Sequence, residues 1–76
     1  MITIYGKPNC PYCDMAKKLC ESKSLPYRYV DIVEQGIGAA DLAEIVGQPV
    51  RTVPQILDEK QYIGGYTELQ KHLQAA

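Results

Sequence analysis

The sequence predicts an α/β domain with a mixed four-stranded sheet flanked by three helices, in the order β-α-β-α-β-β-α. Runs rich in β-branched and aromatic residues alternate with runs whose apolar residues recur at helical spacing. The chain of 76 residues is long enough for one small domain, and it contains no linker and no repeat. We therefore expect a single domain over residues 1–76.

The first half of the chain predicts a strand, a helix and a second strand. Residues 1–5 alternate β-branched and aromatic side chains, which is typical of a strand. Residues 27–33 are also rich in aromatic and β-branched side chains. Residues 11–23 place an apolar stripe at helical spacing, made of Met15, Ala16, Leu19 and Cys20. Because a helix joins the two strands, we expect them to be parallel, with a right-handed crossover.

The second half predicts a helix, a hairpin and a last helix. Residues 39–46 form a short helix that Gly47 ends, with a core-facing side made of Leu42, Ile45 and Val46. Residues 55–57 and 61–63 form an antiparallel hairpin, which Pro54 opens.

The start of the last helix carries its own signal. Thr67 is the expected N-cap, Gln70 completes a capping box, and Tyr66 precedes the cap. Ala75 and Ala76 are expected to fray.

The chemistry of the chain is expected at Cys10 and Cys13, a Cys-x-x-Cys pair at the junction of the first strand and helix. In a small chain this pattern indicates redox chemistry before metal binding. Pro11 fits the first helical position and makes Cys10 the N-cap, where backbone N–H groups and the helix dipole favour a thiolate. Lys7 can add a positive charge near the same sulfur. We expect Cys10 to attack disulfides, and the deeper Cys13 to resolve the mixed disulfide.

A metal site is the competing interpretation of the two cysteines. A closed zinc site requires four ligands, and the only other Cys or His side chains that could serve are Cys20 and His72. Cys20 falls on the core stripe, where a free cysteine behaves as a small hydrophobe. His72 is expected to be a half-solvated helix residue. We therefore expect no metal.

Composition and charge exclude several classes of partner. The formal net charge of −1 gives no reason to expect nucleic acid or an anionic membrane surface. The apolar runs are too short for a membrane span, and the start lacks the features of a signal peptide. Three cysteines do not suit a secreted disulfide scaffold. A cytoplasmic protein is expected.

Three linked motifs resemble the signature elements of the glutaredoxins, especially the short bacterial and phage members. They are Cys10-Pro11-Tyr12-Cys13, Thr52-Val53-Pro54 and Gly64-Gly65-Tyr66-Thr67, in the family's order and near its spacing. The runs Val30-Asp31-Ile32 and Gln48-Pro49-Val50 are also similar. The resemblance implies a thioredoxin-like fold, a cis Val53–Pro54 bond, glutathione as co-substrate and no tightly bound cofactor.

The resemblance also implies a glutathione-binding groove beside the cysteines. In the family, the backbone of Val53 would pair with the cysteinyl part of glutathione like an added strand. One glutathione carboxylate would need a cation, Lys7 or more weakly Arg51, and the other suits a helix N-terminus. The implied groove residues are Lys7, Tyr12, Arg51, Thr52, Val53, Pro54, Gly65, Tyr66, Thr67 and Glu68. Glu68 stands where many relatives carry Asp.

The expected function is a glutathione-dependent thiol–disulfide oxidoreductase that reduces protein disulfides and glutathione mixed disulfides, as a monomer. Ribonucleotide reductase is one acceptor that the family implies, and nothing in the sequence selects it. One alternative is a redoxin recharged by thioredoxin reductase. Another is an iron–sulfur cluster carrier in which Cys10 and glutathione bridge two chains. Pro11 and Cys13 argue against the carrier, because Pro11 stiffens the helix start and Cys13 competes to close a disulfide.

Overall fold

A computed structural model describes residues 1–74, so Ala75 and Ala76, expected to fray, lie outside the described residues. The elements are β1 (Ile2–Gly6), α1 (Pro11–Ser22), β2 (Tyr27–Asp31), α2 (Ala39–Val46), β3 (Gln55–Asp58), β4 (Gln61–Gly64) and α3 (Tyr66–Gln74). The strands form one sheet in the order β2-β1-β3-β4. β1 pairs with β2 in parallel and with β3 antiparallel, and β3 pairs antiparallel with β4. The predicted α/β fold with a mixed sheet is confirmed.

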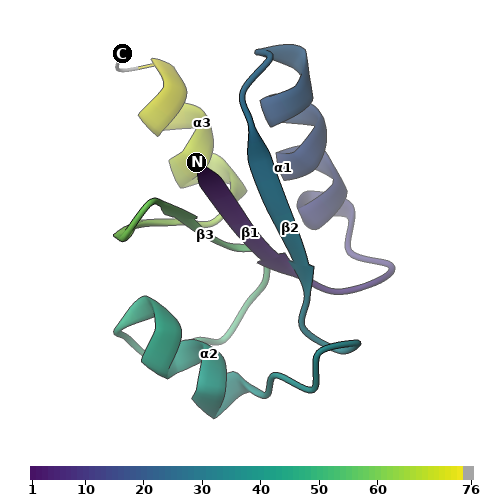
Figure 1. The fold of residues 1–76 in the computed structure, drawn as a ribbon, viewed down its shortest axis with the longest axis vertical. Coiled ribbons are helices and arrows are strands. Elements are labelled where there is room, and N and C mark those ends of the chain that lie inside the picture. The colour runs from purple at the N-terminus through teal and green to yellow at the C-terminus, as the bar shows by residue number, and fades with distance from the viewer. Residues whose placement is uncertain (75–76) are drawn as a thin grey trace.

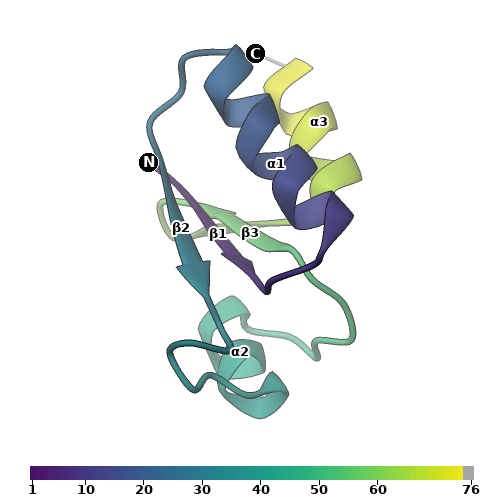
Figure 2. The same cartoon turned by 90° about the vertical axis from the view of Figure 1, so that its right-hand side faces the viewer.

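The helices divide between one face of the sheet and one end of it. α1 and α3 lie side by side over one face, while α2 lies beyond the ends of β1 and β2 (Figures 1 and 2). The main core fills the space between the sheet and these two helices, and its buried members are Ile2, Ile4, Ala16, Cys20, Ile56 and Leu69. A smaller cluster of Leu42, Val46 and Leu57 attaches α2. The helix that carries the cysteine pair therefore rests directly on the main core.

The apolar stripes of α1 and α2 are narrower than predicted. Met15 is 41% exposed and Ile45 is 42% exposed, so the expectation that both face the core is wrong. In α1 the buried line runs through Cys13, Ala16 and Cys20, at spacings of three and four residues. In α2, Leu42 and Val46 are the buried residues, and they pack with Leu57 of β3.

α3 begins at Tyr66, two residues before Glu68, the first helical residue that an N-cap at Thr67 implies. The N–H of Gly65 donates to Glu68 Oε1 at 2.9 Å, and the N–H of Leu69 donates to the Gly65 carbonyl at 2.9 Å. Glu68 therefore reaches back to the residue before the helix, as the third residue of a capping box does. The predicted box of Thr67 and Gln70 is wrong.

The other boundaries lie close to the prediction. β2 ends at Asp31, two residues before its predicted end, because the Asp31 carboxylate accepts the N–H groups of Val33 and Glu34 at 3.0 and 3.1 Å. These bonds turn the chain out of the sheet. Gly47 ends α2 in the left-handed conformation, with φ 82°, as predicted. Among the described helices, none combines the length and apolar character needed to span a bilayer.

Candidate active site

Cys10 and Cys13 stand at the start of α1 and are joined in a disulfide, with their Cα atoms 5.2 Å apart. Cys10 is the N-cap of the helix in an extended conformation, and Pro11 follows in the first turn. The N–H of Cys13 donates to Cys10 Sγ at 3.2 Å. Cys10 is 6% exposed and Cys13 is 0% exposed. An incoming reagent therefore reaches Cys10 more readily than Cys13.

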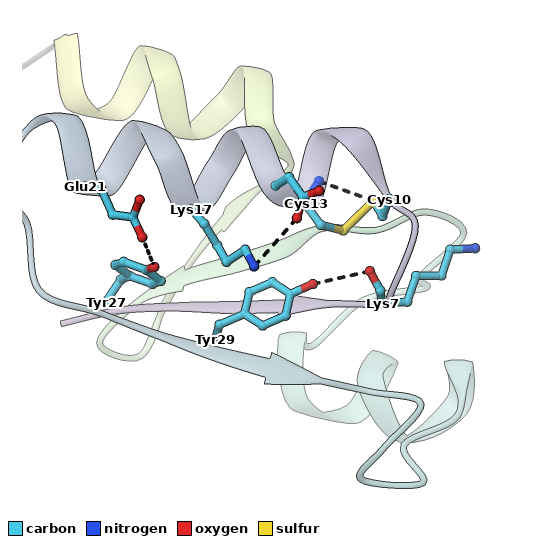
Figure 3. Close-up of polar contacts among 8 residues, drawn as sticks. Lys7, Cys10, Cys13, Lys17, Glu21, Tyr27 and Tyr29 are labelled. Carbon is cyan, nitrogen blue, oxygen red and sulfur yellow. Dashed lines mark hydrogen bonds and ion pairs between the residues drawn. A yellow bond between two sulfur atoms is a disulfide. The ribbon is translucent and has the colours of Figure 1, made fainter.

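The electrostatic surroundings favour a negative charge on Cys10 in the reduced protein. The N-terminus of α1 provides an N–H donor and the positive end of the helix dipole. Asp14 places a carboxylate in the same turn, but its Oδ1 lies 3.6 Å from Lys17 Nζ. Lys7 is exposed and its side chain points away from the disulfide (Figure 3). The helix terminus, rather than Lys7, supplies the positive field at the sulfur in this conformation.

The loop before β3 meets the cysteine pair. The Val53–Pro54 peptide bond is cis, as the resemblance implied, and the Val53 carbonyl oxygen lies 3.8 Å from Cys10 Sγ. A hollow of about 230 Å³ opens at this loop, lined by Tyr12, Thr52, Val53, Pro54, Gly65, Tyr66, Thr67 and Glu68. The rings of Tyr12 and Tyr66 stand 6.1 Å apart between centroids. Three segments distant in the sequence thus converge beside Cys10.

A second hollow adjoins the first at Thr52 and Val53. It measures about 210 Å³ and is lined by Lys7, Ile32, Ala39, Leu42, Val50, Arg51, Thr52 and Val53. Lys7 and Arg51, the two cations expected to meet a carboxylate, therefore lie on the opposite side of Val53 from Tyr66 and Thr67. The two hollows together contain all ten residues of the expected groove.

Gln55 supports the site, and the sequence analysis missed it. This side chain is only 5% exposed. Its Nε2 donates to the Thr52 carbonyl at 2.7 Å, and its Oε1 accepts the Tyr62 hydroxyl at 2.6 Å. It therefore fixes the loop that carries Val53. The available signal was a polar residue opening an otherwise apolar strand.

Cys20 and His72 lie apart from the cysteine pair. Cys20 is fully buried in the main core, as predicted, and burial raises the pKa of its thiol. His72 Nε2 lies 3.0 Å from Asp58 Oδ2, which ties α3 to β3. Within residues 1–74, no three His, Cys, Asp or Glu side chains gather as metal ligands would.

Comparison with known proteins identifies the family. The sequence model of the family Glutaredoxin matches residues 2–63. The chain is 49% identical to glutaredoxin 1 of Salmonella typhimurium, over 88% of this chain and 83% of that protein. Oxidised Escherichia coli glutaredoxin superposes with a TM-score of 0.82 at 42% identity, covering 96% of this chain and 92% of that one. A buckwheat glutaredoxin–glutathione complex superposes with a TM-score of 0.78 at 28% identity, over 97% and 69% of the two chains. The chain belongs to the glutaredoxin family of thiol–disulfide oxidoreductases.

Proposed function

We propose that this oxidoreductase takes its electrons from glutathione and reduces protein disulfides and glutathione mixed disulfides. The observation that carries the proposal is the hollow beside Cys10. Val53 lines this hollow and also brings its carbonyl within 3.8 Å of the Cys10 sulfur, so a tripeptide bound along Val53 would present its thiol to the reactive cysteine. The buckwheat relative that superposes on this chain is a complex with glutathione, which supports the same ligand.

The chemistry of the two hollows matches the two ends of glutathione. The first turn of α3 lies at one end, where N–H groups without helical partners suit a carboxylate. Thr67 and the N–H of Glu68 are the proposed donors. At the other end, Lys7 and Arg51 suit the second carboxylate. Thr52, Val53 and Pro54 provide the backbone edge, Gly65 admits a close approach, and the rings of Tyr12 and Tyr66 wall the groove.

The cysteine pair then works in two modes. With a glutathione mixed disulfide, the Cys10 thiolate attacks the glutathione sulfur, the substrate leaves as a thiolate, and a second glutathione thiolate releases oxidised glutathione and restores Cys10. With a protein disulfide, Cys10 forms a mixed disulfide with the substrate. The Cys13 thiolate then attacks Cys10, the substrate leaves reduced, and two glutathiones reduce the Cys10–Cys13 disulfide.

The proposal extends to the compartment, oligomeric state and protein partners of the chain. The chain would act as a cytoplasmic monomer with no tightly bound cofactor, on protein partners that carry an accessible disulfide. Ribonucleotide reductase is the acceptor to test first, because the family resemblance implied it.

The deciding experiment is NADPH consumption by the pure protein with glutathione, glutathione reductase and a small mixed disulfide. Catalysed consumption is the expected result. Turnover with thioredoxin reductase in place of the glutathione system would instead identify a redoxin with a different donor. A brown protein on anaerobic purification would point to cluster carriage.

A further inference from the structure

Tyr29 lies on the sheet side of Cys13, and Lys17 lies over the Tyr29 ring (Figure 3). Cys13 and Lys17 are one turn apart on the face of α1 that covers β2, and Tyr29 of β2 extends under both (Figure 3). Lys17 Nζ lies 4.4 Å from the centroid of the Tyr29 ring. Cys13 has no exposed surface, so the groups that surround it decide whether its sulfur can carry charge.

The structure brings the Tyr29 hydroxyl to Cys13 across Gly6. A Cβ built on Gly6 would lie 2.5 Å from the Tyr29 hydroxyl oxygen and 2.9 Å from Cys13 Sγ. The hydroxyl and the sulfur therefore border the same small space, which the missing side chain of Gly6 leaves open. Within residues 1–74, the one hydrogen bond of this hydroxyl is a long one, to the Lys7 carbonyl at 3.4 Å. In the oxidised state the hydroxyl therefore keeps a proton that it can offer to the Cys13 sulfur once the disulfide opens.

The charges around Tyr29 keep its hydroxyl a donor. Burial raises the pKa of Tyr29, and the carboxylates of Asp31 and Asp14 raise it further, so the phenol stays protonated at neutral pH. The Lys17 ammonium group lies over the ring face, where the ring attracts a cation, and so helps to hold the ring in place. Asp14 pairs with Lys17 at 3.6 Å, which holds the ammonium group over the ring.

We infer that Tyr29 is a further catalytic residue, whose hydroxyl donates a hydrogen bond to the Cys13 sulfur whenever the disulfide is open, and that Lys17 is its positioning residue. The inference rests on the resolving role proposed for Cys13. When a glutathione thiolate attacks Cys10, a new bond forms between their sulfurs. The Cys10–Cys13 bond breaks and its electron pair goes to Cys13 Sγ. The Tyr29 O–H stabilises that anion without giving up its proton. The same hydrogen bond favours the thiolate form of Cys13 in the reverse reaction, in which Cys13 attacks the mixed disulfide at Cys10.

The first test measures the Cys13 thiol directly and needs no glutathione. In a Cys10→Ser background, the thiolate absorbance of Cys13 is followed against pH with and without Tyr29→Phe, which keeps the ring and its contact with Lys17. Loss of the hydrogen bond should raise the measured Cys13 pKa by about one pH unit, a tenfold loss of thiolate. Lys17→Met should raise it by less. An unchanged Cys13 pKa in Tyr29→Phe would overturn the inference.

Tyr27→Phe is the matched control, because Tyr27 lies two residues away on the same strand face. Its hydroxyl donates to Glu21 at 2.5 Å, away from Cys10 and Cys13. It should leave the Cys13 pKa unchanged. An equal rise in both variants would mean a general effect of losing a phenol on this face, and would also overturn the inference.

The second test distinguishes an effect of the Tyr29 hydroxyl on the Cys13 sulfur from an effect on the Lys7 loop, which the hydroxyl also contacts. With both cysteines present, Tyr29→Phe should lower the ratio of protein-disulfide to mixed-disulfide turnover about tenfold, because only the former uses Cys13. Equal loss of both would indicate that Tyr29 only holds the Lys7 loop and would refute its role at Cys13. If the wild-type protein failed with glutathione altogether, the proposed function would fall, while the titration of Cys13 would still decide the present inference.

Discussion

At the scale of single residues, Cys10 and Cys13 differ in access although they share one helical turn. Cys10 faces the Val53 loop and Cys13 has no exposed surface. Cys10→Ser should therefore abolish all exchange activity. Cys13→Ser should keep glutathione mixed-disulfide reduction but lose most protein-disulfide reduction, measured as NADPH consumption with each substrate. Activity surviving in Cys10→Ser, or equal loss of both reactions in Cys13→Ser, would contradict these roles.

Cys20 is a thiol that should take no part in this chemistry. It is fully buried in the main core, burial raises the pKa of its thiol, and the thiolate is the reactive form. With the Cys10–Cys13 pair oxidised, a thiol reagent should label the protein only after unfolding. Cys20→Ala should lower the free energy of unfolding by about 1 kcal/mol through lost packing, with NADPH-linked activity retained. Rapid labelling of the native protein would show that Cys20 is accessible.

Which site residues could be predicted depends on whether their signal is local. Cys10, Pro11 and Cys13 carry their geometry in four consecutive positions, because a proline after a cysteine fits a helix start. Tyr29 carries no such signal, and Gln55 carries only a weak one, a polar residue at the start of an apolar strand. Tyr29 borders the space beside Cys13 only because its strand pairs with β1 in a particular register, Ile4 against Tyr29, and because Gly6 leaves that space open.

At the scale of elements, the start of α3 links a stabilising contact to the proposed groove. Glu68 Oε1 accepts the N–H of Gly65 at 2.9 Å, and its charge also lies at the positive end of the helix. Glu68→Ala should lower the free energy of unfolding by about 1 kcal/mol, and Glu68→Gln by less, because the amide still accepts the bond. Urea unfolding measures both. Gln70→Ala is the control: a loss as large as that of Glu68→Ala would restore the capping box predicted from sequence.

The two wrong predictions for the helices, that Met15 and Ile45 face the core, share one physical cause. Apolar spacing predicts that a helix has a buried side, but the orientation of that side depends on what the helix packs against. Met15 lies beside the buried line of α1, and Ile45 beside that of α2. α2 also lies beyond the ends of β1 and β2 (Figure 1), apart from the main core that α1 and α3 cover.

At the scale of the whole molecule, the sheet order assembles the site. β1 leads into the cysteine pair, the Val53 loop leads into β3, and β4 leads into α3. The order β2-β1-β3-β4 places these connections next to one another. It also places Tyr29 of β2 on the side of β1 opposite to β3 and the Val53 loop. The alternation of strands and helices predicted this order only in part. The parallel pairing of β1 and β2 followed from the crossover rule, whereas the antiparallel pairing of β1 with β3 needed the structure.

Stability should fall as the solution becomes alkaline, because several groups hold their protons more tightly in the folded chain. Burial raises the pKa of Cys20 above 9.0, a hydrogen bond to Glu21 raises that of Tyr27 above 10.0, and burial raises that of Tyr29 above 10.0. The pKa of the N-terminal amine is raised above 8.0 by its hydrogen bond to Glu59. Above these reference values the unfolded chain releases protons that the folded chain retains, so the free energy of unfolding decreases with pH.

The measurement is the urea midpoint of the oxidised protein, in which Cys10 and Cys13 do not titrate, between about pH 7 and pH 11. It should be level near neutrality and fall from about pH 8 upward, most steeply where the tyrosines of the unfolded chain ionise. Tyr27→Phe and Cys20→Ala should each make the urea midpoint decrease less with pH, because each removes one group whose pKa is higher in the folded chain. A midpoint that stayed constant, or that rose between pH 7 and about pH 10, would mean that these hydroxyl and thiol groups ionise as readily in the folded chain as in the unfolded one.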